Sequence, residues 1–508
     1  MNKLRIANCE LRIAERRNSI SAWGAAWAGL IGSPLRVGEG PEVRSLRGGK
    51  GLGKGLSPLF LIPFLAIALC GCKPKQVAPK PPIVLIVIDT LRADHVGAYG
   101  CPRPTTPNID AFAATAIRFD RAFAASSWTV PSMASLFTGV YPARHGIEHA
   151  ATDGIAITDQ QVLNPQFTTL AAALKEAGYA TFGYSGNYHM NPRFGMALGF
   201  DYYKADGFAN RDVVDGWLAE RLPLLATTAK RGTPYFLYVH YFDPHHPYAP
   251  IKPFIDRFRP AGAPTDEIEA VNAHFNDLLD QGWFALHPEK VPPFIDCYDA
   301  EIAAVDVSIG ALLKKLPNLE QAVVVITADH GEEFLDHGSM AHSKNLYSET
   351  LRVPLFVRLP HRERAGQVDD FLTSLVDLYP TLATLAHAAK PRDLAGVDLF
   401  DRWSRWRSRN RFIFAATRRV AGFDWNAALS RNYKLLYWAD RGSWELYDLA
   451  DDPREKRNVD VDVSARLLRR YQRELLAGRR ERPLHPPGEF TGPRDEKADK
   501  SLKELGYL

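Results

Sequence analysis

Short, nearly uninterrupted apolar runs dominate the hydrophobic pattern of the chain. Residues 83–88, 235–242, 322–328 and 351–357 form such runs, which are rich in β-branched and aromatic side chains. Runs of this length and composition are typical of strands that are buried on both faces of a sheet, as in parallel α/β sheets. Residues 179–184 predict a further strand.

Helical patterns separate these strands. Residues 105–114 combine N-capping residues with an apolar repeat, and residues 168–177 also predict a helix. Residues 298–316 repeat apolar side chains on one face, which indicates a helix that packs against a core. Alternating strands and helices over this length predict one large α/β domain, which we place at residues 83–395.

The character of the sequence changes after this domain. Residues 412–415, 433–437 and 444–449 predict strands of a small antiparallel sheet, and residues 464–476 predict a basic helix. We therefore expect a C-terminal α+β subdomain at residues 396–478. The tail, residues 479–508, is charged and proline-containing, so we expect it to be extended or mobile.

Composition and charge narrow the class of protein. The chain has 508 residues, of which 46% are hydrophobic, and this is a globular composition that can bury a core. Its 62 Lys and Arg residues against 58 Asp and Glu residues give a net charge of +4. This excess is too small and too dispersed to indicate a nucleic acid partner.

A leader precedes the predicted domain. The apolar run 59–69 follows basic residues and is followed by Cys70 and Cys72, an order that resembles a bacterial lipobox. We expect residues 1–72 to be a lipoprotein signal and residues 73–82 to be a linker. Cys72 is the expected lipidation site, and Cys70 is the second candidate.

Lipidation at Cys72 would place the mature protein in the periplasm or at an outer membrane, held to the membrane by its lipid. A plain secretory signal and an uncleaved anchor stay open as alternatives, and the upstream part of the leader suggests a mis-set translation start. Removal of the leader leaves Cys101 and Cys297, which allow one disulfide but do not require it.

Acidic and imidazole residues follow three of the predicted strands. Asp89 follows the first strand, the cluster 243–246 follows the strand at 235–242, and Asp329 with His330 follows the strand at 322–328. Ligand sites of open α/β sheets lie beyond the carboxyl ends of the strands. A loop containing His342 and Lys344 comes next. We expect these groups to form one site.

The segment 126–139 supplies a hydroxyl to this site. It is rich in small and hydroxyl residues and predicts a turn that leads into a helix beginning near Pro131. The free N–H groups of such a helix would face an anion beside Thr129, which we take as the reacting residue. A capping segment on an ordinary surface helix is the alternative interpretation.

The proposed ligand set is Asp89, Thr129, Asp329 and His330. Two carboxylates, an imidazole and a hydroxyl suit Zn²⁺ or Mn²⁺ better than Ca²⁺, although Ca²⁺ stays open. A bound cation would lower the pKa of the Thr129 hydroxyl and make it a nucleophile. His245 or His342 could then protonate the leaving alcohol or hold an ester oxygen.

A second metal or substrate-binding group is conceivable beside the first. Its candidate members are two residues of the 243–246 cluster, Asp243 and His246, together with Lys344. An alternative second group consists of Asp243, His245 and His342.

The chain resembles the sulfatase family of the alkaline phosphatase superfamily. The resemblance runs from residue 83 to about residue 449 and rests on motifs around Asp89, Thr129, Asp243-Pro244-His245 and Asp329-His330-Gly331-Glu332. It implies a doubly wound mixed α/β sheet flanked by helices, as in alkaline phosphatase, with a small C-terminal α+β subdomain. It also implies a divalent metal and hydrolysis of sulfate or phosphate esters.

Three positions depart from the family pattern. Sulfatases carry Cys or Ser at the position of Thr129, where it is converted to formylglycine, a basic residue at the position of Met133, and a second acidic ligand at the position of Thr90. A formylglycine hydrate can expel sulfate by elimination, whereas a sulfated threonine would be a stable ester. Phosphoryl-threonine can be opened by water or an alcohol, as in the threonine-dependent relatives that the ligand set resembles.

We therefore expect a metal-dependent hydrolase of phosphate, phosphonate or sulfate esters with phosphoester chemistry favoured. The substrate would be a small-molecule, glycan or lipid ester, and the oligomeric state stays open. Three alternatives remain: an arylsulfatase-like enzyme without formylglycine, a phosphotransferase that modifies an envelope component, and an inactive surface binding protein.

Overall fold

The computed structural model describes residues 80–148, 161–260, 265–418, 424–459, 465–479 and 481–489. The predicted signal, with Cys70 and Cys72, and most of the predicted linker lie outside the described residues. Residues Ala78–Leu508 group into one compact unit. None of the described helices is both long enough and apolar enough to cross a membrane.

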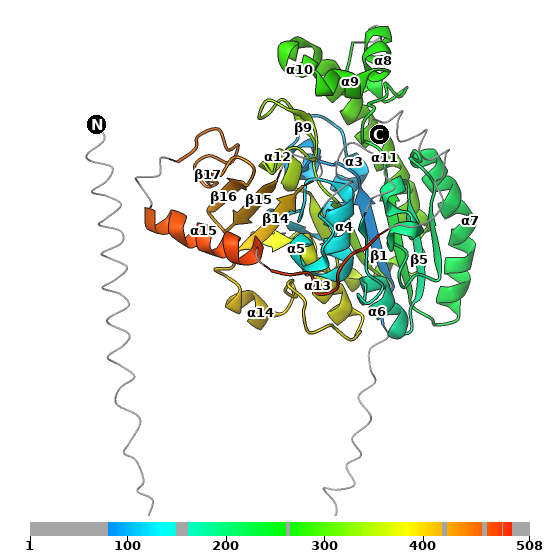
Figure 1. Cartoon of the computed structure of the whole chain (residues 1–508). Coiled ribbons are helices and arrows are strands. Elements are labelled where there is room, and N and C mark those ends of the chain that lie inside the picture. Colours follow the sequence, from blue (N-terminus) through cyan, green and yellow to red (C-terminus); the bar gives the residue numbers. More distant parts are fainter. Residues whose placement is uncertain are drawn as a thin grey trace, which may run out of the picture. The chain divides into compact units, whose positions relative to one another are not determined.

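An eight-stranded mixed sheet forms the centre of this unit (Figure 1). Its order is β12-β2-β11-β8-β1-β7-β5-β6. Five neighbouring strands are parallel, and β11 runs antiparallel to both β8 and β2. The strands are β1 (Ile83–Ile88), β2 (Ile117–Phe119), β5 (Ala180–Ser185), β6 (Tyr202–Ala205), β7 (Tyr235–Tyr241), β8 (Val323–Ala328), β11 (Leu355–Arg358) and β12 (Val368–Asp369).

Helices cover both faces of this sheet. One group, α3, α7 and α11, packs together, with α7 also against β5 and β7. The other group, α4, α6 and α13, packs together, with α6 also against β5. The helices are α3 (Pro107–Ala113), α4 (Thr129–Thr138), α6 (Leu170–Glu176), α7 (Arg211–Lys230), α11 (Pro292–Lys315) and α13 (Leu378–Leu385).

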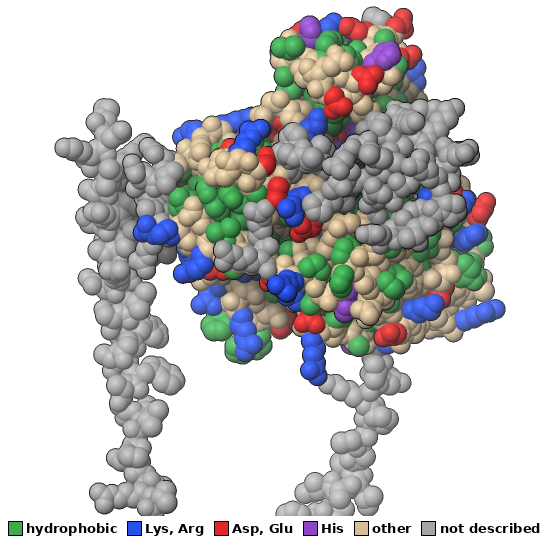
Figure 2. Space-filling view, viewed as in Figure 1, with side chains coloured by type: hydrophobic (Ala, Val, Ile, Leu, Met, Phe, Trp, Pro, Cys, Tyr) green, Lys and Arg blue, Asp and Glu red, His purple; other side chains and the backbone are tan. Residues whose placement is uncertain are grey.

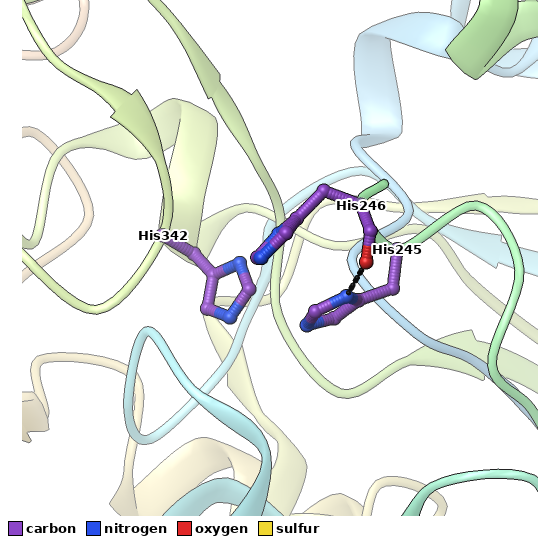
Figure 3. A group of neighbouring side chains, drawn as sticks. All are labelled: His245, His246 and His342. Carbon is purple, nitrogen blue, oxygen red and sulfur yellow. Dashed lines mark hydrogen bonds between the residues drawn. The ribbon is translucent and has the colours of Figure 1, made fainter. Parts of the chain in front are cut away.

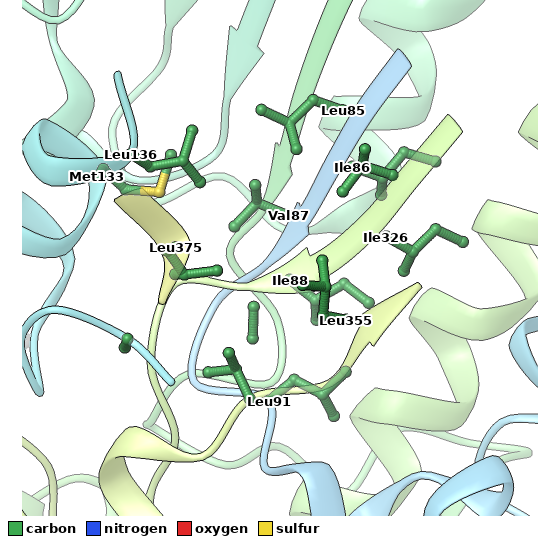
Figure 4. Packing of buried hydrophobic residues seen from close by; sticks show 14 of the residues in the cluster. Leu85, Ile86, Val87, Ile88, Leu91, Met133, Leu136, Ile326, Leu355 and Leu375 are labelled. Carbon is green, nitrogen blue, oxygen red and sulfur yellow. The ribbon is translucent and has the colours of Figure 1, made fainter. Parts of the chain in front are cut away.

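Burial on both faces of the sheet explains why the central strands consist of nearly continuous apolar residues. Every residue of β1 is buried, and alternate side chains point to opposite faces. In Figure 4, Leu85 and Val87 lie toward Met133 and Leu136 of α4, whereas Ile86 lies on the other side of the strand. The doubly wound mixed α/β fold expected from the sequence is therefore confirmed.

A four-stranded antiparallel sheet forms the C-terminal part of the fold. Its order is β14-β15-β16-β17, and α15 packs on β15 and β16. β15 is absent from the sequence prediction because its Asn and Ala residues have low strand propensity, yet it is central and fully buried. These elements are β14 (Ile413–Thr417), β15 (Trp425–Leu429), β16 (Tyr433–Trp438), β17 (Ser443–Asp448) and α15 (Ala465–Arg479).

Shorter elements connect the two sheets and surround their edges. The strands are β3 (Ala122–Phe123), β4 (Gln161–Val162), β9 (Glu333–Phe334), β10 (Met340–Ala341), β13 (Thr373–Ser374) and β18 (Gly488–Glu489). The helices are α5 (Pro142–His145), α8 (Asp266–Asn272), α9 (Phe275–Asp280), α10 (Trp283–Leu286), α12 (Ser348–Leu351) and α14 (Arg402–Arg407).

The described part of the predicted tail lies against the large domain. The backbone N–H of Leu484 donates to the carbonyl of Arg144 at 2.8 Å, and β18 pairs with β4. Residues 490–508 lie outside the described part of the chain. Cys101 and Cys297 are both free thiols, so the disulfide that the sequence allowed does not join them.

Candidate active site

The register of the sheet brings the expected acidic and imidazole residues to one edge. Ile88 of β1 pairs with Ala328 of β8, so Asp89 and Asp329 follow at the same level. Both carboxylates and His330 are fully buried, and their ligand atoms lie within 4.8 Å of one another. Nε2 of His330 is 3.7 Å from Oδ1 of Asp89 and 3.4 Å from Oδ2 of Asp329.

The backbone around His330 fixes the orientation of its ring. Nδ1 of His330 lies 2.8 Å from the carbonyl oxygen of Gly331, so Nδ1–H donates and the Nε2 lone pair faces the carboxylates. Gly331 permits this turn because a Cβ there would lie 2.0 Å from the carbonyl oxygen of Glu349. The tight Asp-His-Gly turn therefore needs a glycine.

Thr129 joins this group as the first residue of α4. Its Oγ1 lies 3.4 Å from Nε2 of His330. The hydroxyl of Ser132 donates to the backbone carbonyl of Asp329 at 2.6 Å, which ties the first turn of α4 to the end of β8. The helix expected near Pro131 begins two residues earlier, so Thr129 itself lies at the positive end of the helix dipole.

Two further side chains complete the environment of Asp89 and Thr129. Nδ2 of Asn187 donates to Oδ2 of Asp89 at 2.6 Å and to Oγ1 of Thr129 at 3.2 Å. Nε2 of His240 lies 3.4 Å from Oδ2 of Asp89. Neither residue was among the sequence candidates.

Sequence signals for both missed residues exist. Asn187 comes two residues after β5, so the reasoning applied to the other strand ends would have included it. His240 interrupts the apolar run of β7 and is fully buried, and a buried histidine requires a polar partner.

The two buried carboxylates repel one another. Burial would raise the pKa of Asp89, but a hydrogen bond with His240 and electrostatic interactions with the neighbouring imidazoles hold it below its usual value. Burial and the charge of Asp89 raise the pKa of Asp329. Oδ1 of Asp89 and Oδ2 of Asp329 are buried and accept no hydrogen bond.

This donor set fits a divalent cation. Two buried carboxylate oxygens without a hydrogen-bond donor are costly, and a cation bound between them would offset both their desolvation and their repulsion. An imidazole nitrogen with a free lone pair beside them is a ligand that Zn²⁺ and Mn²⁺ accept readily. Asp89, Asp329 and His330 are therefore a candidate ligand group for such an ion.

A second group of candidate ligands consists of His245, His246 and His342 (Figure 3), whose ligand nitrogens also lie within 4.8 Å of one another. Nδ1 of His245 donates to the carbonyl oxygen of His246 at 2.6 Å. Nδ1 of His342 lies 3.0 Å from Oε1 of Glu332. The ring of His342 is 4.5 Å from that of His330 and 4.8 Å from that of His245. His342 therefore contacts both the first group and a member of its own group.

Asp243 and Lys344, expected in a second group, are placed elsewhere. Oδ2 of Asp243 accepts the backbone N–H of Arg211 at 2.6 Å, and burial raises the pKa of Asp243 to about 6. His246, and not Asp243, joins His245 and His342. The half-buried Lys344 lines a neighbouring cavity.

This cavity has a volume of about 280 Å³, and Met340 and Lys344 of its lining flank His342 in the sequence. Phe275 of α9 stacks on His246 at 5.1 Å, and α9 and α10 form one wall. The β9–β10 segment and the C-terminal sheet form the other walls. The lining includes Leu279, Phe284, His337, Met340, Lys344, Asn345, Tyr347, Trp425, Trp438 and Arg441.

The structure also gives the surroundings of two departures from the family pattern. Thr90 is buried at a φ of 54°, and its backbone N–H donates to Oδ1 of Asp329 at 3.2 Å. Position 90 therefore holds the candidate ligand Asp329 in place but supplies no acidic ligand of its own. Met133 is fully buried in the core of the sheet, beside β1 (Figure 4).

A doubly wound mixed sheet with carboxylates and imidazoles at its central strand ends, and a hydroxyl at a helix N-terminus, defines a hydrolase of the alkaline phosphatase superfamily. Residues 81–388 match the sequence profile described as Sulfatase. Residues 336–481 match the profile of the C-terminal region of N-sulphoglucosamine sulphohydrolase. The chain therefore belongs to the sulfatase family.

Two curated relatives and one solved structure show the extent of the similarity. An N-acetylglucosamine-6-O-sulfatase of Bacteroides thetaiotaomicron is 21% identical over 495 residues, covering 79% of this chain and 86% of the relative. An arylsulfatase of Clostridium perfringens is 24% identical over 466 residues, covering 78% and 94%. The crystal structure of the phosphonate monoester hydrolase of Agrobacterium radiobacter matches with a TM-score of 0.59 at 22% identity, covering 79% and 95%.

Family membership makes the protein an ester hydrolase, as the sequence predicted. Sulfatases and phosphonate monoester hydrolases are metal-dependent enzymes, and the described residues contain two groups that could hold an ion. Both relatives named above are sulfatases, and one of them is named for a sugar sulfate.

Proposed function

We propose that this protein hydrolyses phosphate or phosphonate esters and that Thr129 is the nucleophile. The observation that carries this proposal is the position of the Thr129 hydroxyl. It lies at the N-terminus of α4, 3.4 Å from Nε2 of His330, and accepts a hydrogen bond from Asn187. The chain carries a threonine where the family resemblance expects the residue that becomes formylglycine.

Asp89, Asp329 and His330 would hold a divalent cation, for which the mixed oxygen and nitrogen donor set favours Zn²⁺ or Mn²⁺ over Ca²⁺. When bound, such an ion supplies Lewis-acid activation of the hydroxyl and of the ester oxygen. Asn187 keeps both Asp89 and Thr129 in place because its amide donates to each. His240, whose Nε2 lies 3.4 Å from the same Oδ2 of Asp89, favours the charged form of this carboxylate.

The reaction would proceed in two displacements. The Thr129 hydroxyl gives its proton to a solvent water, its oxygen attacks phosphorus, a new P–O bond forms, and the bond between phosphorus and the leaving alcohol breaks. His342 or His245 gives a proton from Nε2 to the departing oxygen, since Nδ1 of each is engaged by a protein oxygen. Water then displaces Thr129 from phosphorus, which releases the product and restores the hydroxyl.

Sulfate-ester hydrolysis without formylglycine is the second candidate. The family and the names of both curated relatives favour it. It ranks lower because sulfated Thr129 would be a stable ester with no elimination route. A phosphotransferase would use the same first step and replace water by an acceptor alcohol.

The cavity lined by Met340 and Lys344, which flank His342 in the sequence, supports a proposal for the alcohol that the ester contains. His337 stacks on Tyr347 at 3.6 Å, and the rings of Trp425 and Trp438 lie 3.5 Å apart. Aromatic walls of this kind suit the face of a sugar or an aryl group. Arg441 at the same cavity favours an anionic substituent. A small-molecule or glycan ester fits these features.

A panel of substrates tests the proposal. Purified protein with added Mn²⁺ or Zn²⁺ should turn over an aryl phosphonate monoester, a phosphodiester or an aryl phosphate faster than an aryl sulfate. Thr129→Ala should abolish this turnover. Thr138→Ala, in the last turn of the same helix, is the matched control and should retain it. Sulfatase turnover that survives Thr129→Ala would contradict the proposal.

We also propose that the enzyme is exported and anchored as a lipoprotein through Cys72. The support is the order of basic residues, apolar run and cysteine, followed by a Pro/Lys-rich linker. Acyl chains add about 0.8 kcal/mol per buried methylene, so several chains together form a stable anchor. Detergent-phase partitioning of the native protein should be lost in Cys72→Ala. Equal partitioning of both into the aqueous phase would leave only a secretion signal.

A further inference from the structure

Helix α14 exposes two tryptophans on the surface. The side chains of Trp403 and Trp406 are 70% and 56% exposed, and their rings lie 6.0 Å apart. Large aromatic side chains that stay exposed together mark an interaction surface more often than chance packing. Neither ring lines the cavity that contains Lys344, whose lining comes from other elements.

Strong contacts hold this helix so that the rings point outward. Asp401 caps it by accepting the backbone N–H groups of Trp403 and Ser404. Arg405 forms two hydrogen bonds with Asp369, at 2.6 and 2.7 Å. The helix is therefore fixed through its polar residues, and the tryptophans contribute nothing visible to the core.

Positive charge is concentrated on the same helix and just beyond its last residue, Arg407. Arg402, Arg407 and Arg409 are exposed, and within the described ranges none of them forms an ion pair. The guanidinium of Arg409 lies 4.6 Å from the centre of the Trp406 ring. Figure 2 shows hydrophobic and basic side chains together in the region where Figure 1 places α14. We call Arg402, Trp403, Trp406, Arg407 and Arg409 the α14 patch.

The α14 patch and the active site lie on different sides of the unit. In Figure 1, α14 lies at the lower side of the unit. Helix α9, whose Phe275 stacks on His246, lies at the upper side. A surface that binds α14 would therefore leave the mouth of the site unobstructed.

We propose that the α14 patch binds the surface of a membrane that contains anionic phospholipids. Tryptophan is favoured at the boundary between headgroups and acyl chains, and exposed arginines pair with lipid phosphates. Charge complementarity alone would also suit a nucleic acid, but the two rings between the arginines favour an interface with an apolar layer. Docking through α14 turns the active site away from the bilayer, toward soluble ester substrates.

Vesicle sedimentation tests this proposal independently of Cys72. Residues Ala78–Leu508, which form one compact unit, lack the leader and can be mixed with phosphatidylcholine vesicles with or without phosphatidylglycerol. The unit should sediment only with the anionic vesicles. Trp403→Ala with Trp406→Ala should weaken this binding by at least about tenfold, and Arg402→Glu with Arg407→Glu by at least about 25-fold.

Matched variants exclude unspecific effects. Lys252→Glu with Arg257→Glu reverses two exposed charges beyond the carboxyl end of β7, and Leu286→Ala removes another exposed apolar side chain. Both controls should bind vesicles like the parent, and every variant should keep the parent's turnover of a soluble ester. Binding that α14 variants do not reduce would overturn the proposal.

Two further outcomes would also overturn it. If the charge reversals abolish binding but the tryptophan variant does not, the patch binds polyanions through charge alone. Competition by DNA would then identify such a partner. If gel filtration shows that the tryptophan variant converts a dimer to a monomer, the α14 patch is an interface between two copies of the chain.

Discussion

Oγ1 of Thr129 and Nε2 of His330 lie 3.4 Å apart, although 201 residues separate them in the sequence. One residue begins α4 and the other follows β8. The contact exists because Ser132 binds the carbonyl of Asp329 and brings the helix N-terminus to the strand end. A hydroxyl, a helix dipole and a candidate ligand therefore meet at one point.

Replacing Thr129 separates the roles of its hydroxyl and its shape. Thr129→Val keeps the branched side chain but removes the nucleophile, so kcat should fall by at least about 10³-fold. Thr129→Ser keeps the hydroxyl and should retain activity within about tenfold. Steady-state kinetics on the best phosphonate or phosphate ester provides the comparison. Equal activity of the Val and Ser variants would exclude a Thr129 nucleophile.

Asn187 should position the nucleophile. Asn187→Ala removes the donor to both Asp89 and Thr129, and kcat should fall by about 10² while KM changes little. Asn191→Ala is the control, because Asn191 caps a neighbouring turn outside the site. Elemental analysis should show that Asn187→Ala still binds metal, since Asp89, Asp329 and His330 remain. Loss of metal in this variant would assign Asn187 a ligand role instead.

Metal removal should lower stability as well as activity. Chelation leaves Asp89 and Asp329 facing one another without a cation, so the melting temperature should fall by several degrees and recover with Zn²⁺ or Mn²⁺. Asp329→Asn relieves the repulsion, so its melting temperature in chelator should be no lower than that of the parent. Addition of metal should raise the melting temperature of Asp329→Asn only slightly. Thermal unfolding with and without metal measures both effects.

His145 should make the fold sensitive to acid. Burial lowers the pKa of His145 from 6.5 to about 3, so the folded state binds its proton less tightly than the unfolded state. Stability should therefore fall as the pH drops from about 6.5 toward about 3, by up to about 1.4 kcal/mol per unit from this residue. Above pH 6.5 the residue contributes no pH dependence.

A pair of variants isolates the contribution of His145. His145→Asn keeps an acceptor for the backbone N–H of Ile147 but does not titrate, so the loss of unfolding free energy between pH 7.5 and pH 5 should be smaller than in the parent. The exposed His274→Asn should leave that difference unchanged. Urea unfolding at the two pH values gives the comparison. An unchanged pH dependence in His145→Asn would exclude His145 as the source.

His342 should act on the leaving alcohol. Its Nδ1 is held by Glu332, so Nε2 can deliver a proton or hold an oxygen. If His342 delivers the proton, His342→Ala should slow the hydrolysis of alkyl esters by at least about 10²-fold. The hydrolysis of aryl esters should slow much less, because aryl alcohols leave without a proton. Equal losses for both ester classes would assign His342 to holding an oxygen. The comparison requires kcat/KM on a matched alkyl and aryl pair.

Local sequence patterns determined most of the fold. The apolar runs at β1, β7 and β8 predicted buried strands, because a strand covered on both faces carries mostly apolar side chains along its length. The same patterns placed Asp89 and Asp329 at strand ends. The composition of β15 did not indicate a strand. It is buried because it lies between β14 and β16 in the sheet.

Tertiary structure alone decided which polar groups meet. Asn187 is 98 residues from Asp89 and 58 from Thr129, and only the sheet order brings these three together. That His246 groups with His245 and His342, while Asp243 accepts a backbone N–H from Arg211, depends on how the loop after β7 turns. Periodicity records whether a position is buried, but contacts between distant residues arise from packing, which no local pattern encodes.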